Sequence, residues 1–445
     1  MSTLLIYTHE TTPRLKYIFD LMLTDLLCLS YELTSDSNVF DAYTGAKFSY
    51  SKKAIGNELH FETTVLLFET GIRQQTIITA QHENIQGIFP TLKSALPFDI
   101  FASAFFLVTC YEEYLNDKRD QYGRYRASHK LNYKLGFLNR PMVNYYALSL
   151  EQLLKQHFPT LVTKRHPFKY IATVDVDIAF SYLYKGFKRG AGGIVRSLMF
   201  SDFKDLKQRI SVLTGKQKDP YDTYDYMLDV LRKHHIETRF FFLLADGSRF
   251  DKNTPTCKPQ FRALVKDIAS KYPSGIHLSF KSHIDPDIQK MEKERMEEIT
   301  GKAVTHNRFH YLRFSLPKSY TRLIQLGITD DHSMGYGPHA GFRASICTPY
   351  FFFNLEQNEV TSLKVHPIAF MDTTFAHYKR ESAEHALDKI GEIMNYVKET
   401  GGTCVGLWHN SSFTDVAEWK GYKYVFESTA AKASALMDAN EYTHA

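Results

Sequence analysis

Hydrophobic and polar positions over residues 168–445 alternate between short apolar runs and longer amphipathic stretches. The apolar runs are typical of strands covered on both faces, and they include YIATVDVD, ETRFFFLLAD, GIHLSF, HNRFHYLRF, LKVHPIAFMD and CVGLWHN. Helical stretches such as PQFRALVKDIASKY and SAEHALDKIGEIMNYVKETG lie between them. Repeated strand-then-helix units predict an α/β fold with a parallel sheet. We expect a distorted, incomplete (β/α) barrel of about seven parallel strands.

The first part of the chain has a less regular pattern. A strand-like TLLIYT is followed by the helical RLKYIFDLMLTDLL, by short strand-like runs and by an amphipathic helix over 97–116. This mixture predicts a smaller α+β domain over residues 1–165, and its polar residues show no ligand spacing. The polar segment VTKRHPFKY is the best candidate for a linker, so the second domain is expected over 166–445. A glycine-containing stretch near 184–219 predicts a helical insertion after the first strand of that domain.

Length and charge limit the classes of function. With 445 residues, the chain exceeds the size at which a single core usually keeps growing, and two domains are expected. The net charge of +5 comes from 54 basic and 49 acidic residues without a long block of one sign. This balance argues against nucleic acid as the main partner.

The sequence indicates a reduced compartment. The N-terminus has no basic region followed by an apolar run and a cleavage site, so no secretory signal is expected. The longest apolar run, FDIFASAFFLVTCY, is too short to cross a bilayer, so no transmembrane segment is expected. The five cysteines are scattered and contain no C-x-x-C pair. We therefore expect a cytoplasmic protein without a structural zinc knot.

Two aspartates interrupt the first strand of the second domain. In KYIATVDVDIAF, Asp175 and Asp177 are two residues apart, so their side chains point to the same face of the strand. The strand could end near Val174 and leave both carboxylates in solvent. Alternatively, one aspartate is a metal ligand and the other a general base at the carboxyl end of the strand, where α/β folds place their chemistry.

The ends of the other predicted strands favour the second alternative, because they too carry ionisable residues. Together with the first strand, the set is Asp175, Asp177, His277, His310, Asp330, Asp331, Asp372 and His409. The carboxyl ends of parallel strands converge in space, so we interpret these residues as one site. One carboxylate and two imidazoles would suit zinc, cobalt, nickel, iron or manganese and would leave positions open for water.

Several strings resemble a known family. TVDVD, GIHLSF and GLWHN are similar to the T-F-D-D, H-[ST]-x-x-H and L-x-H motifs of the polysaccharide deacetylase (NodB-homology, carbohydrate esterase family four) superfamily. RFHYLRFSLPKSY, DDHSMGYGPHAGFRASICTPYFFFN and FMDTTF resemble a bacterial branch in which such a domain follows an uncharacterised N-terminal domain. The resemblance implies that Asp175 is the base, that Asp177 and His277 are metal ligands, and that His409 is the acid.

The chain departs from the motif at one position. Lys281 stands where the superfamily has its second histidine, so another residue must supply the third ligand. We favour His310, and His283 is the alternative. The resemblance places Arg313 as the arginine that orients the base. Asp331 is expected to assist at the catalytic site and Arg343 to contact substrate, although Arg343 could equally be a surface ion-pair partner.

These expectations define a function and its rivals. The leading hypothesis is metal-dependent hydrolysis of an acetyl group, preferably N-acetyl, on a carbohydrate or glycan precursor, with zinc as the favoured metal. A catalytically silent glycan-binding module is a rival, because a lost histidine could mean a lost metal. A glycosidase is disfavoured, because two carboxylates on one face of one strand cannot readily flank a glycosidic bond.

Overall fold

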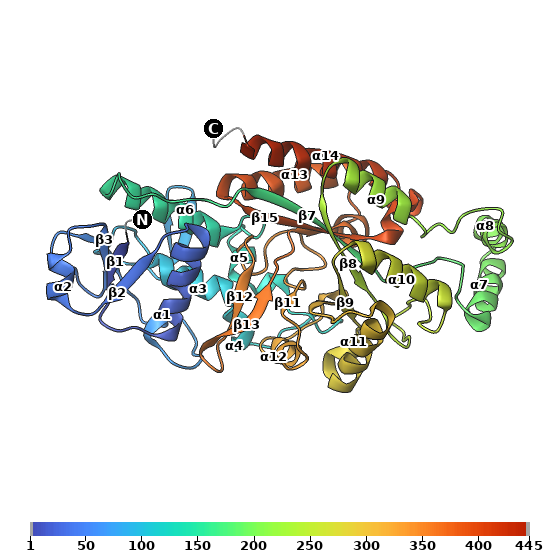
Figure 1. Cartoon of the computed structure of the whole chain (residues 1–445), viewed down its shortest axis with the longest axis horizontal. Helices are drawn as coiled ribbons and strands as arrows, with labels where there is room; N and C mark the ends of the chain where they lie inside the picture. Colours follow the sequence, from blue (N-terminus) through green and yellow to red (C-terminus); the bar gives the residue numbers. More distant parts are fainter. Residues whose placement is uncertain (1–2, 442–445) are drawn as a thin grey trace.

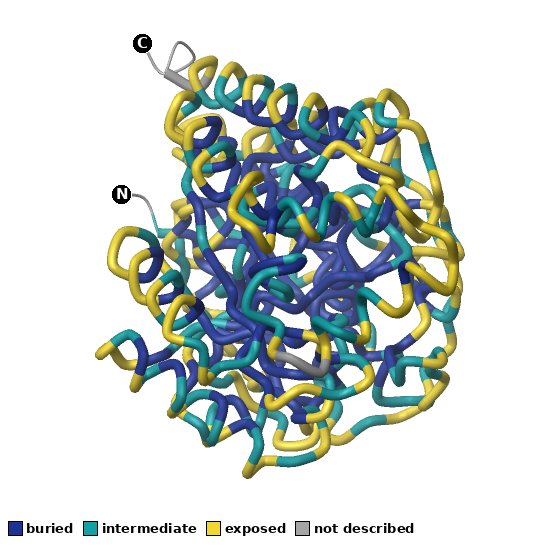
Figure 2. The backbone as a smooth tube through the Cα atoms, turned by 90° about the vertical axis from the view of Figure 1, so that its right-hand side faces the viewer, coloured by how far each residue is buried: buried dark blue, intermediate teal, exposed yellow. Residues whose placement is uncertain are grey.

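The computed structural model describes residues 3–441. It is a mixed α/β structure with two sheets built mainly from parallel strands, together with a small antiparallel hairpin. Buried segments gather at the centre of the molecule, and exposed coils lie around them (Figure 2). No helix in the described part of the chain has the length and hydropathy needed to cross a bilayer.

The first sheet has the order β2-β1-β3-β4 and is parallel throughout. Its strands are β1 (Leu4–Tyr7), β2 (Tyr31–Thr34), β3 (Lys47–Ser51) and β4 (Leu59–Glu62). Helix α1 (Pro13–Phe19) begins where the Thr12 hydroxyl accepts the backbone N–H of Leu15, and the π-helical η1 (Asp20–Leu26) continues it. This crossover carries the chain back, so β1 and β2 pair in parallel. The parallel N-terminal sheet differs from the α+β arrangement expected from the sequence.

The remaining N-terminal elements cover this sheet and connect it to the rest of the molecule. They are α2 (Ser37–Ala42), η2 (Leu66–Phe68), β5 (Thr79–His82), β6 (Ile85–Ile88), α3 (Ile100–Val108), α4 (Glu112–Leu115), η3 (Ala127–His129), α5 (Leu131–Lys134) and α6 (Met142–His157).

The large sheet has nine strands in the order β12-β13-β11-β10-β9-β8-β7-β15-β14. The strands are β7 (Phe168–Val176), β8 (Glu237–Phe242), β9 (Ser274–Leu278), β10 (His306–Phe309), β11 (Asp330–Asp331), β12 (Tyr350–Asn354), β13 (Glu359–Val365), β14 (Phe370–Met371) and β15 (Gly402–His409). All pairings are parallel except that between β12 and β13. No pairing joins the edge strands β12 and β14 within residues 3–441, so hydrogen bonding does not close the sheet.

Helices and short helical turns follow most strands of this sheet. They are α7 (Phe187–Met199), α8 (Phe203–Leu213), α9 (Tyr224–Lys233), α10 (Pro259–Lys271), η4 (Ser282–Ile284), α11 (Pro286–Thr300), η5 (His310–Leu312), α12 (Lys318–Gln325), η6 (Thr374–Lys379), α13 (Ala383–Thr400), η7 (Asn410–Thr414), η8 (Ala417–Trp419) and α14 (Tyr422–Glu441). Helices α7 and α8 occupy the stretch expected as an insertion. They lie at the opposite end of the molecule from the N-terminal sheet (Figure 1).

One buried hydrophobic cluster runs through both parts of the chain. The rings of Tyr17 and Phe105, from α1 and α3, lie 5.0 and 5.2 Å from the ring of Phe353 in β12. The hydroxyl of Tyr17 donates a hydrogen bond to the carbonyl of Phe351 at 2.9 Å. The N-terminal part is therefore packed directly against the edge of the large sheet.

Candidate active site and metal centre

Four parallel strands bring five ionisable side chains to one edge of the large sheet. Asp175 in β7 lies opposite His409 at the end of β15. His277 is in β9, while Asp177 and His310 follow directly after β7 and β10. The carboxyl ends of these parallel strands meet at the same edge, which is where α/β folds bind their ligands.

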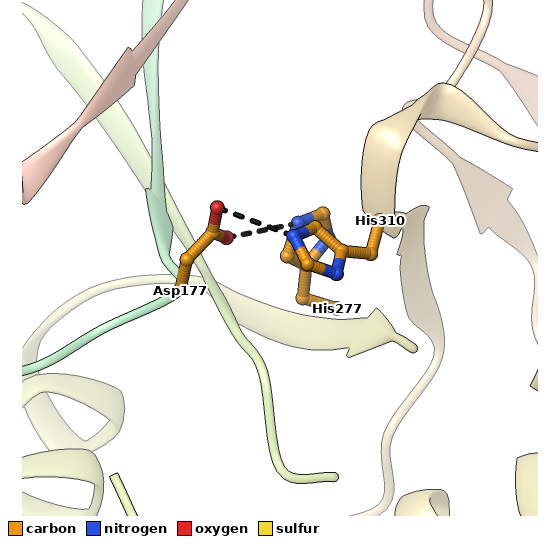
Figure 3. Close-up of side chains that lie close together, drawn as sticks. All are labelled: Asp177, His277 and His310. Atoms are coloured by element: carbon orange, nitrogen blue, oxygen red, sulfur yellow. Dashed lines mark ion pairs between the residues drawn. The ribbon is translucent and has the colours of Figure 1, made fainter. Parts of the chain in front are cut away.

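Asp177, His277 and His310 form a cluster that could hold a metal ion. One ligand atom from each residue lies within 4.8 Å of the others. Nε2 of His277 is 3.2 Å from Oδ1 of Asp177, and Nε2 of His310 is 3.3 Å from Oδ2 of Asp177 (Figure 3). His310 therefore lies in the cluster, and His283 does not. The oxygen and nitrogen donors form the kind of mixed set that divalent transition metals accept.

Hydrogen bonds at the far side of each imidazole orient it for this role. Nδ1 of His277 donates to the carbonyl of Arg308 at 2.9 Å, and Nδ1 of His310 donates to Oδ1 of Asp251 at 2.8 Å. In the neutral form with the proton on Nδ1, Nε2 of each ring faces the cluster and can offer its lone pair to a cation. Nε2 of His277 and Oδ1 of Asp177 are buried, and apart from the ion-pair contacts with each other and with Asp175 they have no hydrogen-bond partner in residues 3–441, so both could serve as ligands of a cation.

Electrostatics couple the members of the cluster. Burial would raise the pKa of the Asp177 carboxyl, but the imidazoles of His310 and His277 hold it well below its usual value. Burial would lower the pKa of His310, but the carboxylates of Asp177 and Asp251 raise it to about 9. In the metal-free protein the carboxylate of Asp177 is therefore ionised beside a protonated His310, and a cation that binds there would displace the imidazole proton.

Asp175 lies next to the cluster but has a different partner. Its Oδ1 accepts a hydrogen bond from Nη1 of Arg308 at 2.7 Å, and its Oδ2 is 3.5 Å from Nε2 of His277. Arg308 is fully buried, donates through Nε to the carbonyl of His332, and lies over the ring of Phe241. The guanidinium supplies the counter-charge that a buried carboxylate needs. The arginine that holds Asp175 is thus Arg308, which the sequence analysis did not single out.

His409 lies on the other side of the same cavity. Its Nδ1 donates to Oδ1 of Asp372 at 2.8 Å, and its Nε2 is 3.8 Å from Oδ2 of Asp177. Asp372 is fully buried and also accepts the backbone N–H of His409 and the hydroxyl of Ser412. Burial would lower the pKa of His409, but mainly the carboxylate of Asp372 raises it to about 10.

These side chains line a cavity of about 590 Å³. That volume is in the usual range for small-ligand sites. Its wall includes Tyr311 and Tyr378 from the second part of the chain and Tyr122 and Arg124 from the N-terminal part. Nη1 of Arg124 donates to the hydroxyl of Tyr378 at 3.0 Å and to the carbonyl of Tyr311 at 3.4 Å. The N-terminal part therefore supplies part of the cavity wall.

The structure places Arg313 and Asp331 away from Asp175. Nη1 of Arg313 donates to the carbonyl of Phe280 at 2.9 Å, and the guanidinium lies over the Phe280 ring. Asp331 is buried and accepts hydrogen bonds from the side chains of Asn307, Tyr320 and Ser333. The hydroxyl of Ser333 in turn accepts the backbone N–H of Phe309. Asp331 thus supports the end of β10, just before His310, and does not line the cavity.

Arg343 and His283 also lie outside the cavity. Nε and Nη2 of Arg343 donate to the two carboxylate oxygens of Glu113 at 2.9 and 2.5 Å, and both side chains are buried. Arg343 thus forms an ion pair, but a buried one and not the surface pair that was the alternative to substrate contact. Nε2 of His283 is 3.4 Å from the hydroxyl of Ser315, and burial with nearby arginines lowers the pKa of His283 to about 4.

Comparisons with known proteins give a limited result. Residues 4–159 match the model of a family of unknown function, DUF7033. No curated protein matches the sequence. A crystal structure from Mycobacterium smegmatis, provisionally assigned as a polysaccharide deacetylase, is 14% identical over 61% of this chain and 85% of its own, with a TM-score of 0.40. A polysaccharide deacetylase from Bacillus cereus is 14% identical over 62% of this chain and 88% of its own, with a TM-score of 0.29. These neighbours are polysaccharide deacetylases, the family that the motifs resemble. At these TM-scores, the function has to be inferred from the geometry of the site.

Proposed function

We propose that this chain is a metal-dependent hydrolase that removes an acetyl group, preferably an N-acetyl group, from a carbohydrate or glycan precursor. One observation carries the proposal: the Asp177–His277–His310 cluster shares a cavity with a buried carboxylate, Asp175, and with the imidazole of His409, which comes from β15 on the other side of β7 from β9 and β10. Metal-assisted hydrolysis needs these three components, which are a metal site, a base for the attacking water and an acid for the leaving group.

Asp177, His277 and His310 would hold the metal, and their donor atoms favour zinc, with cobalt, nickel, iron or manganese as alternatives. Bound there, the metal would polarise the acetyl carbonyl and lower the pKa of a water molecule. The orientation of both imidazoles by Arg308 and Asp251 supports this role, because such partners fix the ligands of metal sites. The main sheet would correspond to the incomplete (β/α) barrel expected from the sequence.

Asp175 would accept the proton of the attacking water. Arg308 holds Oδ1, which leaves Oδ2 beside the metal cluster. Attack of the water oxygen on the acetyl carbon and cleavage of the C–N bond would release acetate and the free amine of the sugar. Because Asp175 lies in β7 and Asp177 directly follows it, the base would lie next to the residues that would hold the metal.

His409 would donate the proton that the departing amine requires. Its Nδ1 is bound to Asp372, so Nε2 is the atom that faces the cavity. A pKa of about 10 keeps this imidazole protonated at neutral pH, as a general acid must be before the C–N bond breaks.

The cavity wall suits a carbohydrate. Tyr122, Tyr311 and Tyr378 combine apolar ring faces with hydroxyl groups, and such side chains can cover a sugar ring while hydrogen bonding to its hydroxyls. The binding-module alternative rested on Lys281. His310 provides a third member for the metal cluster, which favours the enzyme.

The two aspartates give the experiment that tests the proposal. Asp177→Asn should remove both metal, measured by elemental analysis, and acetate release from an N-acetylated oligosaccharide. Asp175→Asn should keep the metal and lower the turnover roughly 100-fold or more, which is the usual effect of losing a general base. His310→Ala should lose metal, and its control His283→Ala should retain it. No bound metal after incubation of the native chain with zinc, cobalt or nickel would refute the proposal, and so would full activity in both aspartate variants.

A further inference from the structure

Helices α7 and α8 form a hairpin that projects from the body of the protein. The hairpin follows β7, whose carboxyl end carries Asp175 and Asp177, and it lies at the far end of the molecule in Figure 1. Its base is tied to the body: Nη1 of Arg189 donates to the carbonyl of Asn253 at 3.0 Å. The carboxylate of Asp219 accepts the backbone N–H groups of residues 181–183. The hairpin is therefore held at its base and leaves its outer surface uncovered.

The outer surface of the hairpin is apolar. Each of seven large hydrophobic side chains is at least half exposed, and these are Val195, Leu198, Met199, Phe200, Phe203, Ile210 and Leu213. They are seven of the nineteen large hydrophobic residues that are exposed in the described part of the chain, although residues 195–213 are a small fraction of it. Phe200 and Phe203, 75% and 68% exposed, directly follow the end of α7 and begin α8, respectively. Such a concentration marks an interaction surface.

The same hairpin carries a strong positive charge. Residues 184–219 contain nine lysines and arginines against three aspartates, a net charge of +6, whereas the whole chain has +5. Asp202 caps α8, Asp205 binds Ser197 and Arg209, and Asp219 binds backbone amides. All three aspartates are thus satisfied within the structure. No ion pair is found within the described residues for the four exposed cations Arg196, Lys204, Lys207 and Lys216.

We propose that the hairpin of α7 and α8 binds the surface of an anionic lipid bilayer. An apolar helical face with aromatic residues, surrounded by unpaired lysines and arginines, has the chemistry of a helix that lies in the membrane interface. Phe200 and Phe203 enter the boundary between headgroups and acyl chains, while Lys204 and Lys207 face the anionic headgroups. Because the hairpin begins at the edge of the sheet that carries the metal cluster, it anchors that edge near the membrane. The proposal does not depend on the deacetylase activity.

The test is sedimentation of the full-length protein with vesicles. We expect the native chain to bind vesicles of equal phosphatidylglycerol and phosphatidylcholine, and to bind vesicles of phosphatidylcholine alone at least tenfold more weakly. Phe200→Ser with Phe203→Ser should lower binding at least tenfold. Lys204→Gln with Lys207→Gln should lower it about 25-fold, since one basic residue near an anionic surface contributes about fivefold. The matched control is Leu92→Ser with Val162→Ser, at two positions that are 95% and 80% exposed outside the hairpin, and it should bind like the native chain.

A second measurement locates the contact. Both native tryptophans, Trp408 and Trp419, are buried, so a tryptophan placed by Phe203→Trp should dominate any fluorescence change and shift to the blue on anionic vesicles. The proposal is overturned if the native chain does not bind anionic vesicles, or if the hairpin variants bind them as well as the native chain does. It is also overturned if light scattering shows a dimer without lipid that Phe200→Ser with Phe203→Ser abolishes, because the apolar face would then cover a second copy.

Discussion

Replacing Asp372 by asparagine should move the basic limb of the activity profile to lower pH. Oδ1 of Asp372 accepts Nδ1–H of His409 at 2.8 Å, and the carboxyl group is fully buried. Burial alone would lower the pKa of His409, and Asp372 is the first cause that raises it to about 10, ahead of Asp177 and Asp175. An amide keeps a hydrogen-bond acceptor but has no charge, so in the variant the pKa of His409 should fall towards the ordinary value of about 6.5.

The expected loss depends on pH in a way that follows from this shift. With a pKa near 6.5, about one imidazole in a hundred is protonated at about pH 8.5, so kcat/KM should fall about 100-fold there. At about pH 6 roughly three quarters of the imidazole is still protonated, so the loss from this cause should be less than about twofold. The raised pKa of His409 also stabilises the folded protein. This contribution to the free energy of unfolding is fully present below the unfolded pKa of about 6.5 and is lost as pH rises through about 10.

The assay is the initial rate of acetate release from an N-acetylated oligosaccharide between about pH 5.5 and 9.5, with the metal content measured for each variant. Ser412→Ala is the matched control, because it removes a hydrogen bond to Asp372 but keeps the carboxylate charge. A basic limb that stays in place in Asp372→Asn, or that moves equally in Ser412→Ala, would show that the charge of Asp372 does not keep His409 protonated.

Three further predictions concern the cavity wall, acid–base stability and the two parts of the chain. Tyr122→Ala should raise KM severalfold while metal content and kcat stay near native, and a fall in kcat alone would contradict a binding role. Burial raises the pKa of Glu292 to about 7, so the free energy of unfolding should fall as pH rises from about 4.3 to about 7. Glu292→Gln should remove this fall in the urea midpoint, and an unaltered pH dependence would contradict the prediction. Residues 166–445 alone are expected to fold. Their Tm should be lower than that of the whole chain, because the N-terminal partners of Phe353 and Arg343 are missing. Insolubility of that fragment would show that the two parts form one obligate unit.

The amino-acid pattern contains most of what positions the cluster. Strand ends can be recognised because buried strands are continuous apolar runs, and ionisable residues that interrupt such runs must have partners. This reasoning selects eight residues, of which the structure brings Asp175, Asp177, His277, His310 and His409 to one cavity. The other three do not line it: Asp330 bonds to His366, Asp331 supports the end of β10, and Asp372 holds His409. It cannot give the number of strands, because β11 and β14 have only two residues each and show no periodicity.

The partners of these residues are harder to derive. Arg308 and His310 are two residues apart, a spacing that in an extended chain puts both on one face, and Arg308 pairs in register with His277. That alternation is the signal that could have identified Arg308, whereas the resemblance pointed to Arg313. Asp251 lies in a loop, where no periodicity constrains a side chain. Its contact with His310 spans 59 residues of sequence and depends on tertiary packing.

The cavity wall that Tyr122 and Arg124 supply has a consequence for how such a chain can be recombined. The residues that we propose to perform the chemistry all follow residue 166, but part of the cavity wall comes from the first 165 residues. If the proposed function holds, a chimera that exchanges the N-terminal part between two related chains is expected to keep the proposed reaction and change the choice of sugar. Substrate preference would then change by recombination at one junction, without any substitution at Asp177, His277 or His310.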